Sequence, residues 1–375
     1  MKSKWKAKRL GDISTINYGY TAKASFNKAD SLFLRITDIQ DNFVDWKTVP
    51  YCSISEIDYE KYKLIDNDIV FARTGATTGK SYLIKKPPKS VAASYLIRLR
   101  LTDCDILPEF IAKYFQTPTY WNDISLGIVG SAQGGFNASK LSDLIIPVPP
   151  IEEQKRIVEI LDKAFEGIAQ AEANTRRNLI NARELFDSYL DKILTDCRWE
   201  TKQISECFRV KSGNFLPKNK MNNFGEFKVY GGNGVAGQHD QFNLEGKNIL
   251  IGRVGAKCGN IKTINAKIWL TDNALYISEF LVDFDLDFLS FVLERADLGK
   301  TANQTAQPVI SYTTIKSVFI SYPKATEQQK TIVKKVYKIK DCLQDLEKIY
   351  QRKLEAIAEL KQSILEKAFT GQLSQ

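Results

Sequence analysis

Apolar residues in two long segments of the chain recur with an alternating spacing of three and four positions. The segments, residues 152–195 and 326–370, contain no proline and a single glycine, Gly167. A seam of period 3.5 that continues over several heptads predicts a helix that pairs with another helix as a coiled coil. The seam positions are Ile157, Leu161, Ala164, Ile168, Ala171, Ala182, Leu185 and Tyr189, and then Ile332, Val336, Ile339, Leu343, Leu346, Tyr350, Ile357, Leu360 and Ile364. Its polar interruptions are Thr175, Asn178 and Lys353.

The ends of both segments carry helix signals. Thr326-Glu-Gln-Gln329 has the form of an N-terminal capping box, and Gly371 stands where a C-terminal cap is expected. Two ordinary core helices are the alternative, but helices of ~45 residues, roughly 65 Å long, rarely fit inside one compact domain. We expect the two helices to pair with each other in antiparallel fashion, because this arrangement separates the junctions at Pro150 and Pro323.

The residues before each long segment have the pattern of strands and turns. Short β-branched and aromatic runs at 68–72, 95–101 and 247–251 lie between clusters of Gly, Asn, Asp and Pro. We expect one short helix in each region, over Pro108–Phe115 and over Leu286–Leu293. The chain is therefore predicted to be α+β, with two mixed α/β domains separated by two long helices that form an antiparallel coiled coil.

The same sequence features occur twice, in the same order. Residues 72–80 return as 252–260, residues 131–133 as 305–307, and Glu153-Gln154 as Glu327-Gln328. The ends of the long segments, 185–195 and 360–370, also match. Near the start of each copy, Trp5, Lys8, Leu10, Asp12, Ile16 and Gly19 correspond to Trp199, Lys202, Ile204, Glu206, Val210 and Gly213. Ordered matches of this kind indicate a tandem duplication of roughly 180 residues, much longer than a solenoid repeat.

The duplication and the helix pattern together divide the chain into four parts. We expect a first domain at 1–150, a first long helix at 151–197, a second domain at 198–324 and a second long helix at 325–375. The two halves are predicted to be related by a pseudo-two-fold axis. Two copies of one domain suggest a molecule that meets its target twice.

Composition and charge narrow the class of protein. The chain is 43% hydrophobic and 26% charged, which is ordinary for a globular protein. No apolar stretch approaches the ~20 residues of a membrane span, and the basic N-terminus leads into no apolar signal core. We therefore expect a cytoplasmic protein with no membrane partner. The net charge of +9 makes nucleic acid a plausible partner, because phosphate contacts release counterions.

The thiol and imidazole groups offer little chemistry. Six cysteines are scattered without a Cys-x-x-Cys pair, which argues against a zinc site and against a disulfide framework. We expect them to be small, mostly buried hydrophobic residues. His239 is the only histidine, so neither a histidine-rich metal site nor a Ser/His/Asp triad can be assembled elsewhere in the chain. No metal and no catalytic residue is expected.

A glycine-rich run resembles a nucleotide-binding loop only in part. Gly75-Ala-Thr-Thr-Gly-Lys-Ser81 lacks one of the residues that a P-loop has between its glycines, and its copy, Gly255–Asn260, lacks the lysine. Both copies keep an arginine, Arg73 or Arg253, and a tight turn after a strand. A phosphate-contacting turn and a structural hairpin with a surface arginine are the two interpretations. No adenine-methyltransferase motif is present either, since Val148-Pro-Pro-Ile151 lacks the polar group and the aromatic ring.

The two copies differ most at 18–66 and 212–245, although the sequence on both sides of these stretches aligns well. Divergent loops on a repeated frame suit two binders that read different targets, and simple drift of surface loops is the alternative. Asn, Gln, Thr, Lys and Arg side chains, which occur in these loops, read base edges in the major groove.

These features together resemble the specificity (S) subunit of a type I restriction–modification system along nearly the whole chain. The resemblance rests on the order of Ile69–Gly75 with Ile249–Gly255, of Pro149-Pro-Ile-Glu-Glu-Gln154, and of Ser363–Gly371. The second copy departs from the pattern at Pro323-Lys-Ala-Thr-Glu-Gln328, and Pro308-Val309 stands where the first copy has Gly134-Gly135.

The resemblance implies a non-catalytic subunit that binds a split, asymmetric target in double-stranded DNA, with one domain for each half. It implies two modification (methyltransferase) subunits docked on the helices, and restriction subunits that translocate and cut DNA. S-adenosylmethionine, ATP and Mg²⁺ would belong to those partners, and this chain would hold no cofactor. A coiled-coil protein scaffold and an enzyme that acts on DNA by itself are the alternatives.

Candidate DNA-binding residues follow from the turns and the divergent loops. Phosphate contacts are expected from Arg73, Lys80, Arg253 and Lys257, and Thr74 is expected to bind DNA beside them. The first half-site is assigned to Tyr20, Thr21, Lys23, Gln133 and Asn137. The second is assigned to Asn233, Gln238, His239 and Gln307, with an ordinary loop histidine as the alternative for His239.

Overall fold

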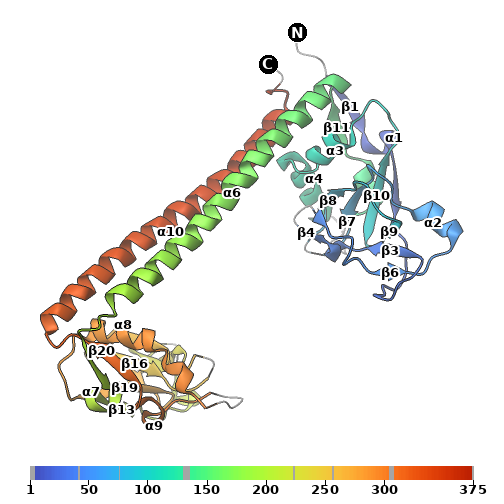
Figure 1. Ribbon diagram of the computed structural model, residues 1–375. Helices are drawn as coiled ribbons and strands as arrows, with labels where there is room; N and C mark the ends of the chain where they lie inside the picture. The colour runs from blue at the N-terminus through green and yellow to red at the C-terminus, as the bar shows by residue number, and fades with distance from the viewer. Residues whose placement is uncertain are drawn as a thin grey trace. The chain divides into compact units, whose positions relative to one another are not determined.

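The structure is a computed structural model that describes residues 5–40, 43–75, 77–129, 136–222, 224–255, 257–303 and 308–373. The chain folds into two compact units. Unit 1 contains the chain up to Arg176 and again from Gln351 onward, and unit 2 contains Arg177–Tyr350. Each unit combines a strand-rich region with one half of each long helix (Figure 1).

Unit 1 contains a two-stranded sheet β1-β11, a four-stranded antiparallel sheet β2-β10-β7-β8 and a three-stranded sheet β6-β3-β9. A small hairpin, β4-β5, is added to these sheets. The strands are β1 (Lys6–Arg9), β2 (Ser14–Tyr18), β3 (Ser31–Leu34), β4 (Ile39–Gln40), β5 (Phe43–Val44), β6 (Tyr51–Cys52), β7 (Ile69–Ala72), β8 (Ser81–Leu83), β9 (Ser90–Ala92), β10 (Leu96–Leu101) and β11 (Ile145–Val148). The helices are α1 (Leu10–Ile13), the 3-10 helix η1 (Ile36–Asp38), α2 (Glu56–Tyr62), α3 (Pro108–Tyr114), α4 (Pro118–Val129), α5 (Ala138–Ser142) and α6 (Ile151–Ile193), which continues into unit 2.

Unit 2 repeats this arrangement with the sheets β12-β20, β13-β19-β16-β17 and β15-β14-β18. The strands are β12 (Glu200–Gln203), β13 (Phe208–Ser212), β14 (Phe227–Gly231), β15 (Gly234–His239), β16 (Lys247–Gly252), β17 (Ile261–Asn265), β18 (Ile268–Leu270), β19 (Ala274–Phe280) and β20 (Phe319–Tyr322). The helices are α7 (Ile204–Cys207), η2 (Lys218–Lys220), α8 (Leu286–Ala296), η3 (Leu298–Thr301), α9 (Tyr312–Ile315) and α10 (Thr326–Phe369), which continues into unit 1.

The stretches that differ most between the copies nevertheless carry two strands each of equivalent three-stranded sheets. In unit 1 the central strand β3 pairs antiparallel with β6 and parallel with β9. In unit 2 the central strand β14 pairs antiparallel with β15 and parallel with β18. Backbone hydrogen bonds hold these strands together whatever side chains they bear. The repeated frame therefore extends through the loops whose sequences have diverged.

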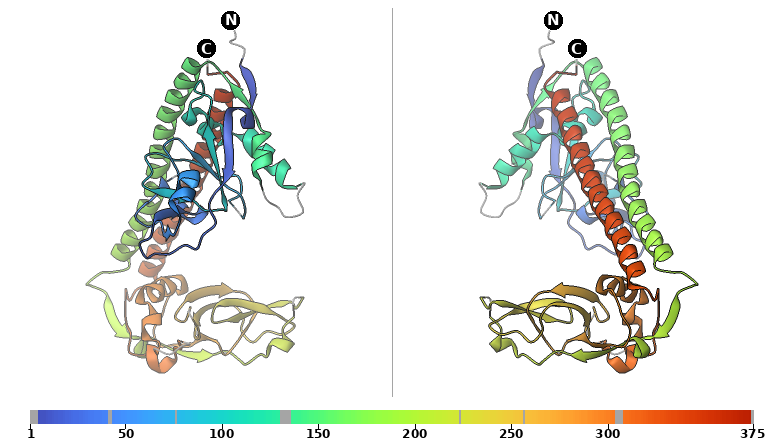
Figure 2. Two further views of the ribbon diagram at one scale, coloured as in Figure 1. Left: turned by 90° about the vertical axis from the view of Figure 1, so that its right-hand side faces the viewer. Right: turned by 90° about the vertical axis from the view of Figure 1, so that its left-hand side faces the viewer.

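The long helices run antiparallel, as predicted, and the packing within each unit shows it. In unit 1, Ile157 and Leu161 near the start of α6 share a core with Leu365 and Ala368 near the end of α10. In unit 2, Leu190 near the end of α6 packs against the cluster that contains Ile332, Val333 and Val336 at the start of α10. Figure 2 allows the two helices to be followed from a second direction.

The seam between the helices is less closed than its heptad pattern predicts. Leu185, Leu346 and Leu360 occupy seam positions, but 72%, 40% and 51% of their surfaces are exposed. Thr175, a polar interruption, is fully buried and donates its hydroxyl to the carbonyl of Ala171 at 2.7 Å. These three leucines are therefore less buried than a continuous coiled-coil seam would make them.

The start of each long helix is fixed by a buried glutamine. The Gln154 side chain accepts a hydrogen bond from the Leu107 amide and donates to the carbonyls of Asp105 and Pro149, at 2.8–2.9 Å. Gln329 is likewise fully buried; it accepts from the Asp285 amide and donates to the carbonyls of Asp283 and Pro323. The structural counterpart of Gln154 is therefore Gln329, one residue beyond the sequence match with Gln328. Gln329 also does not close the predicted capping box, because its amide is used in these bonds.

The shorter elements agree only in part with prediction. The runs at 68–72, 95–101 and 247–251 form β7, β10 and β16, and the two expected short helices are α3 and α8. Gly371 has φ of +74° directly after α10, as expected for a C-terminal cap. One helix per region was an underestimate, because α2, α4 and α5 also form in unit 1.

Candidate nucleic-acid interface and helix groove

The glycine-rich run of each unit is a hairpin turn that is closed by its own backbone hydrogen bonds. In unit 1 the turn joins β7 to β8, and the amides of Thr78, Gly79 and Lys80 bond to the carbonyls of Gly75, Ala72 and Thr77. The unit 2 turn between β16 and β17 repeats all three bonds at residues 258–260. A phosphate-binding loop needs free amides. Each turn is therefore a hairpin and not a nucleotide-binding loop, and its bonds leave open whether the arginine beside it contacts phosphate.

The arginine before each turn has the same backbone partners in both units. The Arg73 amide bonds to Tyr95 at 3.1 Å, and its carbonyl accepts from Phe136 at 3.2 Å. The Arg253 amide bonds to Asn273, and its carbonyl accepts from Ile310, both at 2.9 Å. Both side chains are therefore presented from an equivalent, hydrogen-bonded position at the end of a buried strand.

The two arginine side chains have different neighbours. The Arg73 guanidinium lies 4.8 Å from the centre of the Tyr18 ring, and the Tyr18 hydroxyl accepts a hydrogen bond from the Ala138 amide at 3.2 Å. Arg253 instead donates to the carbonyl of Asp272 at 3.0 Å, and Ser212 stands in the place of the tyrosine. The same frame therefore presents different chemistry in each unit.

The other predicted phosphate contacts, Lys80 and Lys257, lie on or beside the turns and are exposed. Thr74, the DNA-binding candidate next to Arg73, is also exposed. Asn137 lies near Arg73, because the Phe136 amide bonds to the Arg73 carbonyl and the Ala138 amide bonds to the Tyr18 hydroxyl. The Asn137 side-chain oxygen caps α5 by accepting a hydrogen bond from the Lys140 amide at 2.9 Å. Its side-chain NH₂ group is the part that would remain for a base.

The first-unit candidates Tyr20, Thr21 and Lys23 line one polar hollow, with a volume of about 520 Å³. Tyr20 is anchored there by its amide bond to Ala92 at 2.7 Å and by its ring, 5.3 Å from that of Tyr62. The rest of the wall comes from Ala22, Ser25, Asn27, Lys28, Ala29 and Ser53. The structure thus groups three predicted residues on one concave surface.

The second-unit candidates fall into two groups at opposite ends of β15. Asn233 lies in the β14–β15 turn, where its side-chain nitrogen comes close to Gly255 of the arginine turn. Gln238 and His239 end the same strand, about 16 Å away at ~3.3 Å per residue. His239 contacts the Lys220 carbonyl through Nδ1 at 3.1 Å, and its ring packs edge-on against Trp269. It is therefore a partly buried, partnered histidine.

Two predicted residues, Gln133 and Gln307, lie outside the described residues. Within the described ranges, no group of three or more His, Cys, Asp or Glu side chains could hold a metal ion. Over those same ranges, no helix is long and apolar enough to cross a membrane.

The cysteines depart from the expectation that most are buried. All six are free, and only Cys52 and Cys207 are buried. Burial raises the pKa of each of these two thiols to about 11. Cys104, Cys197 and Cys342 are exposed, and Cys258 is half-buried.

Sequence reasoning missed several side chains that share these surfaces. Tyr18 stacks on Arg73, and its position directly before the repeated Gly19 was a usable signal. Phe26 and Phe224 are 78% and 96% exposed, although Phe26 was visible as a lone aromatic in a run of small and polar residues and Phe224 lies between polar residues and a glycine.

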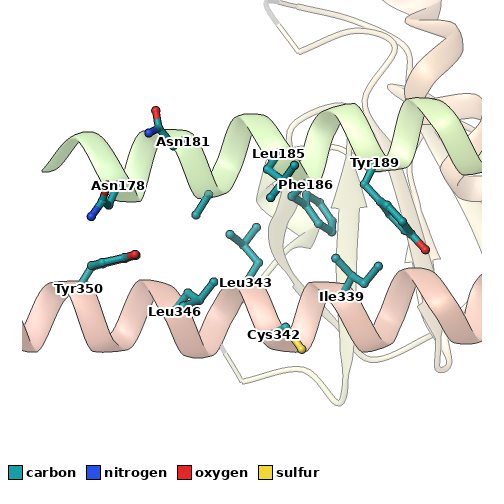
Figure 3. A pocket seen from close by; sticks show the side chains of 11 residues that line it. Asn178, Asn181, Leu185, Phe186, Tyr189, Ile339, Cys342, Leu343, Leu346 and Tyr350 are labelled. Carbon is teal, nitrogen blue, oxygen red and sulfur yellow. The ribbon is translucent and has the colours of Figure 1, made fainter. Parts of the chain in front are cut away.

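A second surface lies in unit 2, between the last turns of α6 and the first half of α10. It is a groove of about 530 Å³, and Figure 3 shows side chains from both helices directed into it. Leu185, Phe186 and Tyr189 come from α6, while Ile339 and Leu343 face them from α10. Arg183 and Glu347 form an ion pair at 2.7 Å between the same helices. The exposed seam leucines Leu185 and Leu346 both line this groove.

Comparison with known proteins agrees with this geometry. The model of the type I restriction modification DNA specificity domain matches residues 2–182 and again residues 197–356. The chain is 24% identical to the putative type I restriction enzyme MjaX specificity subunit of Methanocaldococcus jannaschii, over 98% of this chain and 93% of that protein. It is 22% identical to the EcoprrI specificity subunit of Escherichia coli, over 85% of this chain and 84% of the relative.

Solved structures share the fold. A chain from a structure that addresses complex assembly and conformational transition of the type I R-M system superposes with a TM-score of 0.78, at 17% identity over 98% of both chains. The crystal structure of the HsdS subunit from Thermoanaerobacter tengcongensis gives a TM-score of 0.60 at 16% identity, over 98% of this chain and 97% of that one.

The match of both repeated α+β units to this family model defines the DNA-specificity component of a restriction–modification system. The chain belongs to the family of type I restriction–modification specificity subunits. It is the DNA specificity subunit of such a system, and the predicted α+β fold with two duplicated domains is confirmed.

Proposed function

We propose that each unit reads one half of a split, asymmetric sequence in double-stranded DNA. Residues 1–150 and 198–324 would form the two target-recognition domains, and 151–197 and 325–375 the two helical parts. Half-sites about one helical turn apart, roughly 34 Å, would let both domains enter the major groove on one face of the duplex. The net charge of +9 favours such a polyanionic partner.

One observation carries this proposal: the same frame is built twice but carries different side chains. Arg73 and Arg253 have equivalent backbone partners, yet one guanidinium stacks on Tyr18 and the other binds a carbonyl. A conserved frame with changed neighbours suits a common phosphate contact beside two different base readers.

The phosphate contacts can be tested by salt dependence. Arg73→Ala or Lys257→Ala should weaken binding to all DNA about equally and reduce the slope of log affinity against log salt by about one. The matched control is Lys338→Ala on the exposed face of α10. An unchanged slope in both variants would remove these residues from the interface.

The half-site assignment can be tested with two sets of substitutions. Changing Thr21 and Lys23 should relax only the first half-site, and changing Asn233 and Gln238 should relax only the second. Each mismatch at a base contact costs about 1–3 kcal/mol. Relaxation of both half-sites by one set, or of neither by both sets, would contradict separate readers.

We further propose that the helices dock two modification subunits. The unit 2 groove supports this, because it leaves Leu185 72% exposed beside Leu346 and Phe186. Leu185→Glu should lower the amount of modification subunit that co-purifies, because the second subunit would dock elsewhere on the helices, while leaving the chain folded, since the position is already exposed. Ile180→Glu is the control, because Ile180 is exposed on the same helix but does not line the groove. Equal co-purification of both variants would exclude the groove as a docking surface.

The catalytic steps of the system would be carried out by partner subunits and not by this chain. The modification subunits would carry S-adenosylmethionine, and restriction subunits would use ATP and Mg²⁺, in the cytoplasm. A scaffold that binds only proteins would retain partner binding without DNA selectivity. An independent enzyme would methylate DNA as an isolated chain, and a methylation assay on that chain alone separates this alternative from the proposal.

A further inference from the structure

Two phenylalanines project into solvent from the recognition regions. Phe224 in unit 2 is 96% exposed, the highest exposure of any large hydrophobic residue in the described part of the chain. Phe26 in unit 1 is 78% exposed. A single exposed apolar residue needs no explanation. A matching pair, held in the same way at the same place in two units, does need one.

In unit 2 the turn that carries Phe224 is held at Asn222 by backbone and side-chain hydrogen bonds, an arrangement that we call a clamp. The Asn222 backbone forms a two-bond bridge to Gln238 on β15, with both N–O distances at 3.0 Å. The Asn222 side-chain oxygen then accepts hydrogen bonds from the Phe224 amide, at 2.8 Å, and from the Gly225 amide. This turn fixes the backbone from which the phenyl ring extends.

Unit 1 uses the same device. The Ser25 backbone forms a two-bond bridge to Tyr51 on β6, at 2.9 and 2.7 Å. The Ser25 hydroxyl accepts a hydrogen bond from the Asn27 amide at 3.1 Å, across Phe26. Here too, a polar residue is bridged to an edge strand, and its side chain accepts a hydrogen bond that closes the turn beside an exposed phenylalanine.

The two clamps lie at equivalent places in the fold. β6 and β15 are the antiparallel edge strands beside the central strands β3 and β14, and each clamp pairs with the edge strand of its own unit. The two clamps lie in the stretches where the sequences diverge, so sequence comparison does not reveal the match. The topology does reveal it.

The surroundings of both rings are polar and basic. In unit 1, Lys23 and Lys28 line the hollow next to Phe26, and the Arg35 guanidinium lies 6.0 Å from its ring. In unit 2, Lys218 and Lys220 precede Phe224 and are exposed. Within the described residues, none of these four lysines has a carboxylate within ion-pair distance. Cations around an isolated ring match a phosphate backbone with bases between its strands better than they match an apolar protein surface.

We propose that Phe26 and Phe224 are the apolar base contacts of the two units, and that each ring lies against the bases of its own DNA half-site. Phenylalanine contacts bases either at a thymine methyl or as a wedge against the stack, and both contacts bury the ring on a base. This inference rests on the proposed function, because it requires each unit to bind a half-site.

The test uses the full chain in complex with its modification subunit and the split target obtained by selection. Phe224→Ala should weaken binding to the intact target roughly 5- to 150-fold, the range for loss of an aromatic–base contact. Binding to DNA scrambled in the second half-site should not change. The slope against salt should also stay constant, because the ring carries no charge. Phe26→Ala should show the same pattern for the first half-site.

Phe319→Ala is the matched control, because Phe319 is 63% exposed but lies on β20, in the sheet β12-β20. An abasic-site scan then completes a double-mutant cycle. At one nucleotide of the half-site, removing the base should make wild type and Phe224→Ala bind equally.

The outcomes separate this inference from the function beneath it. If the wild-type complex selects no split target, the proposed function fails. If it does select one, but both alanine variants bind it as tightly as Phe319→Ala, the rings do not contact DNA. A variant that loses both half-sites equally, or an abasic scan in which no position equalises wild type and variant, would also overturn the inference.

Discussion

Replacing Gln154 with leucine should destabilise unit 1 more than any change of similar size on the exposed faces of α6. Leucine is close to glutamine in volume but cannot form hydrogen bonds. The substitution would remove the partners of the Leu107 amide and of the Asp105 and Pro149 carbonyls. These groups connect the start of α6 to the start of α3, where the Leu107 amide begins the helix.

The magnitude follows from these three bonds. Each hydrogen bond contributes about 0.5–1.5 kcal/mol net, and a buried amide or carbonyl left without a partner costs about 1–3 kcal/mol. Part of this cost is offset because leucine is more favourably buried than glutamine and the loop can relax. We expect a loss of about 2–4 kcal/mol in the free energy of unfolding.

Hydrogen exchange by mass spectrometry can assign the loss to one unit. A single unfolding midpoint would not, because a chain with two units need not unfold in one step. Peptides that span 105–111 should exchange roughly 30- to 800-fold faster, while peptides that span 283–289 in unit 2 change little. Gln329→Leu should give the reverse result, since the Asp285 amide bonds to Gln329 at 2.8 Å.

Gln170→Leu is the control, because Gln170 is exposed on the same helix and bonds only to Asn174 among the described residues. If Gln154→Leu behaves like Gln170→Leu, within about 0.5 kcal/mol, the buried glutamine does not fix the helix start. If Gln154→Leu opens both units equally, the equivalence of the two glutamines is wrong.

Three further predictions concern glycine and cysteine. Gly167→Ala should stabilise unit 1 by about 0.5–1 kcal/mol in urea denaturation, because Gly167 is helical and nothing lies within 4 Å of an added Cβ; a loss of stability would contradict this. Gly259→Ala should destabilise unit 2 by about 2 kcal/mol or more in the same assay, because its φ is +86° and an added Cβ would overlap the Gly299 backbone; a neutral result would contradict this. In alkylation of the folded chain at pH 8, only accessible thiols should be labelled rapidly, and Cys52 and Cys207 should react only after unfolding. Burial raises the pKa of each of these two thiols to about 11 and keeps it neutral at that pH. Rapid labelling of either thiol would contradict this.

The long helices and the duplication could be read from sequence because both are periodic over many residues. The seam from Ile332 to Ile364 and the matched turns at Gly75 and Gly255 recur at fixed spacing, and each match adds to the others. Buried strands such as Ile69–Ala72 were also visible, because a short apolar run between turn residues has few other uses.

Other features depend on contacts that no spacing encodes. Two strands of each three-stranded sheet lie in the divergent stretches and pair through backbone bonds, so their side chains carry no shared pattern. Gln154 was visible as part of a repeat, but its burial comes from three carbonyl and amide partners, two of them more than forty residues away. The exposure of Leu185 likewise follows from how far the helices separate, which heptad spacing does not specify.

Some residues of the candidate DNA-binding site could likewise be predicted from the sequence, and others could not. Arg73 and Arg253 were identified because the turn beside each is repeated, and both have equivalent backbone partners. The role of the Asn137 oxygen as a helix cap could not be anticipated, because α5 itself was not predicted. Phe26 and Phe224 were passed over, because the clamps that hold them are bridges between distant segments.

The central claim is that this chain reads two half-sites at a fixed separation, and selection from a random DNA pool tests it most directly. The chain would be co-expressed with its modification subunit, purified as a complex and used to capture DNA for sequencing. The account predicts an asymmetric motif in two parts with one constant gap. Recovery of unselected DNA, of a single uninterrupted motif, or of no DNA would contradict it.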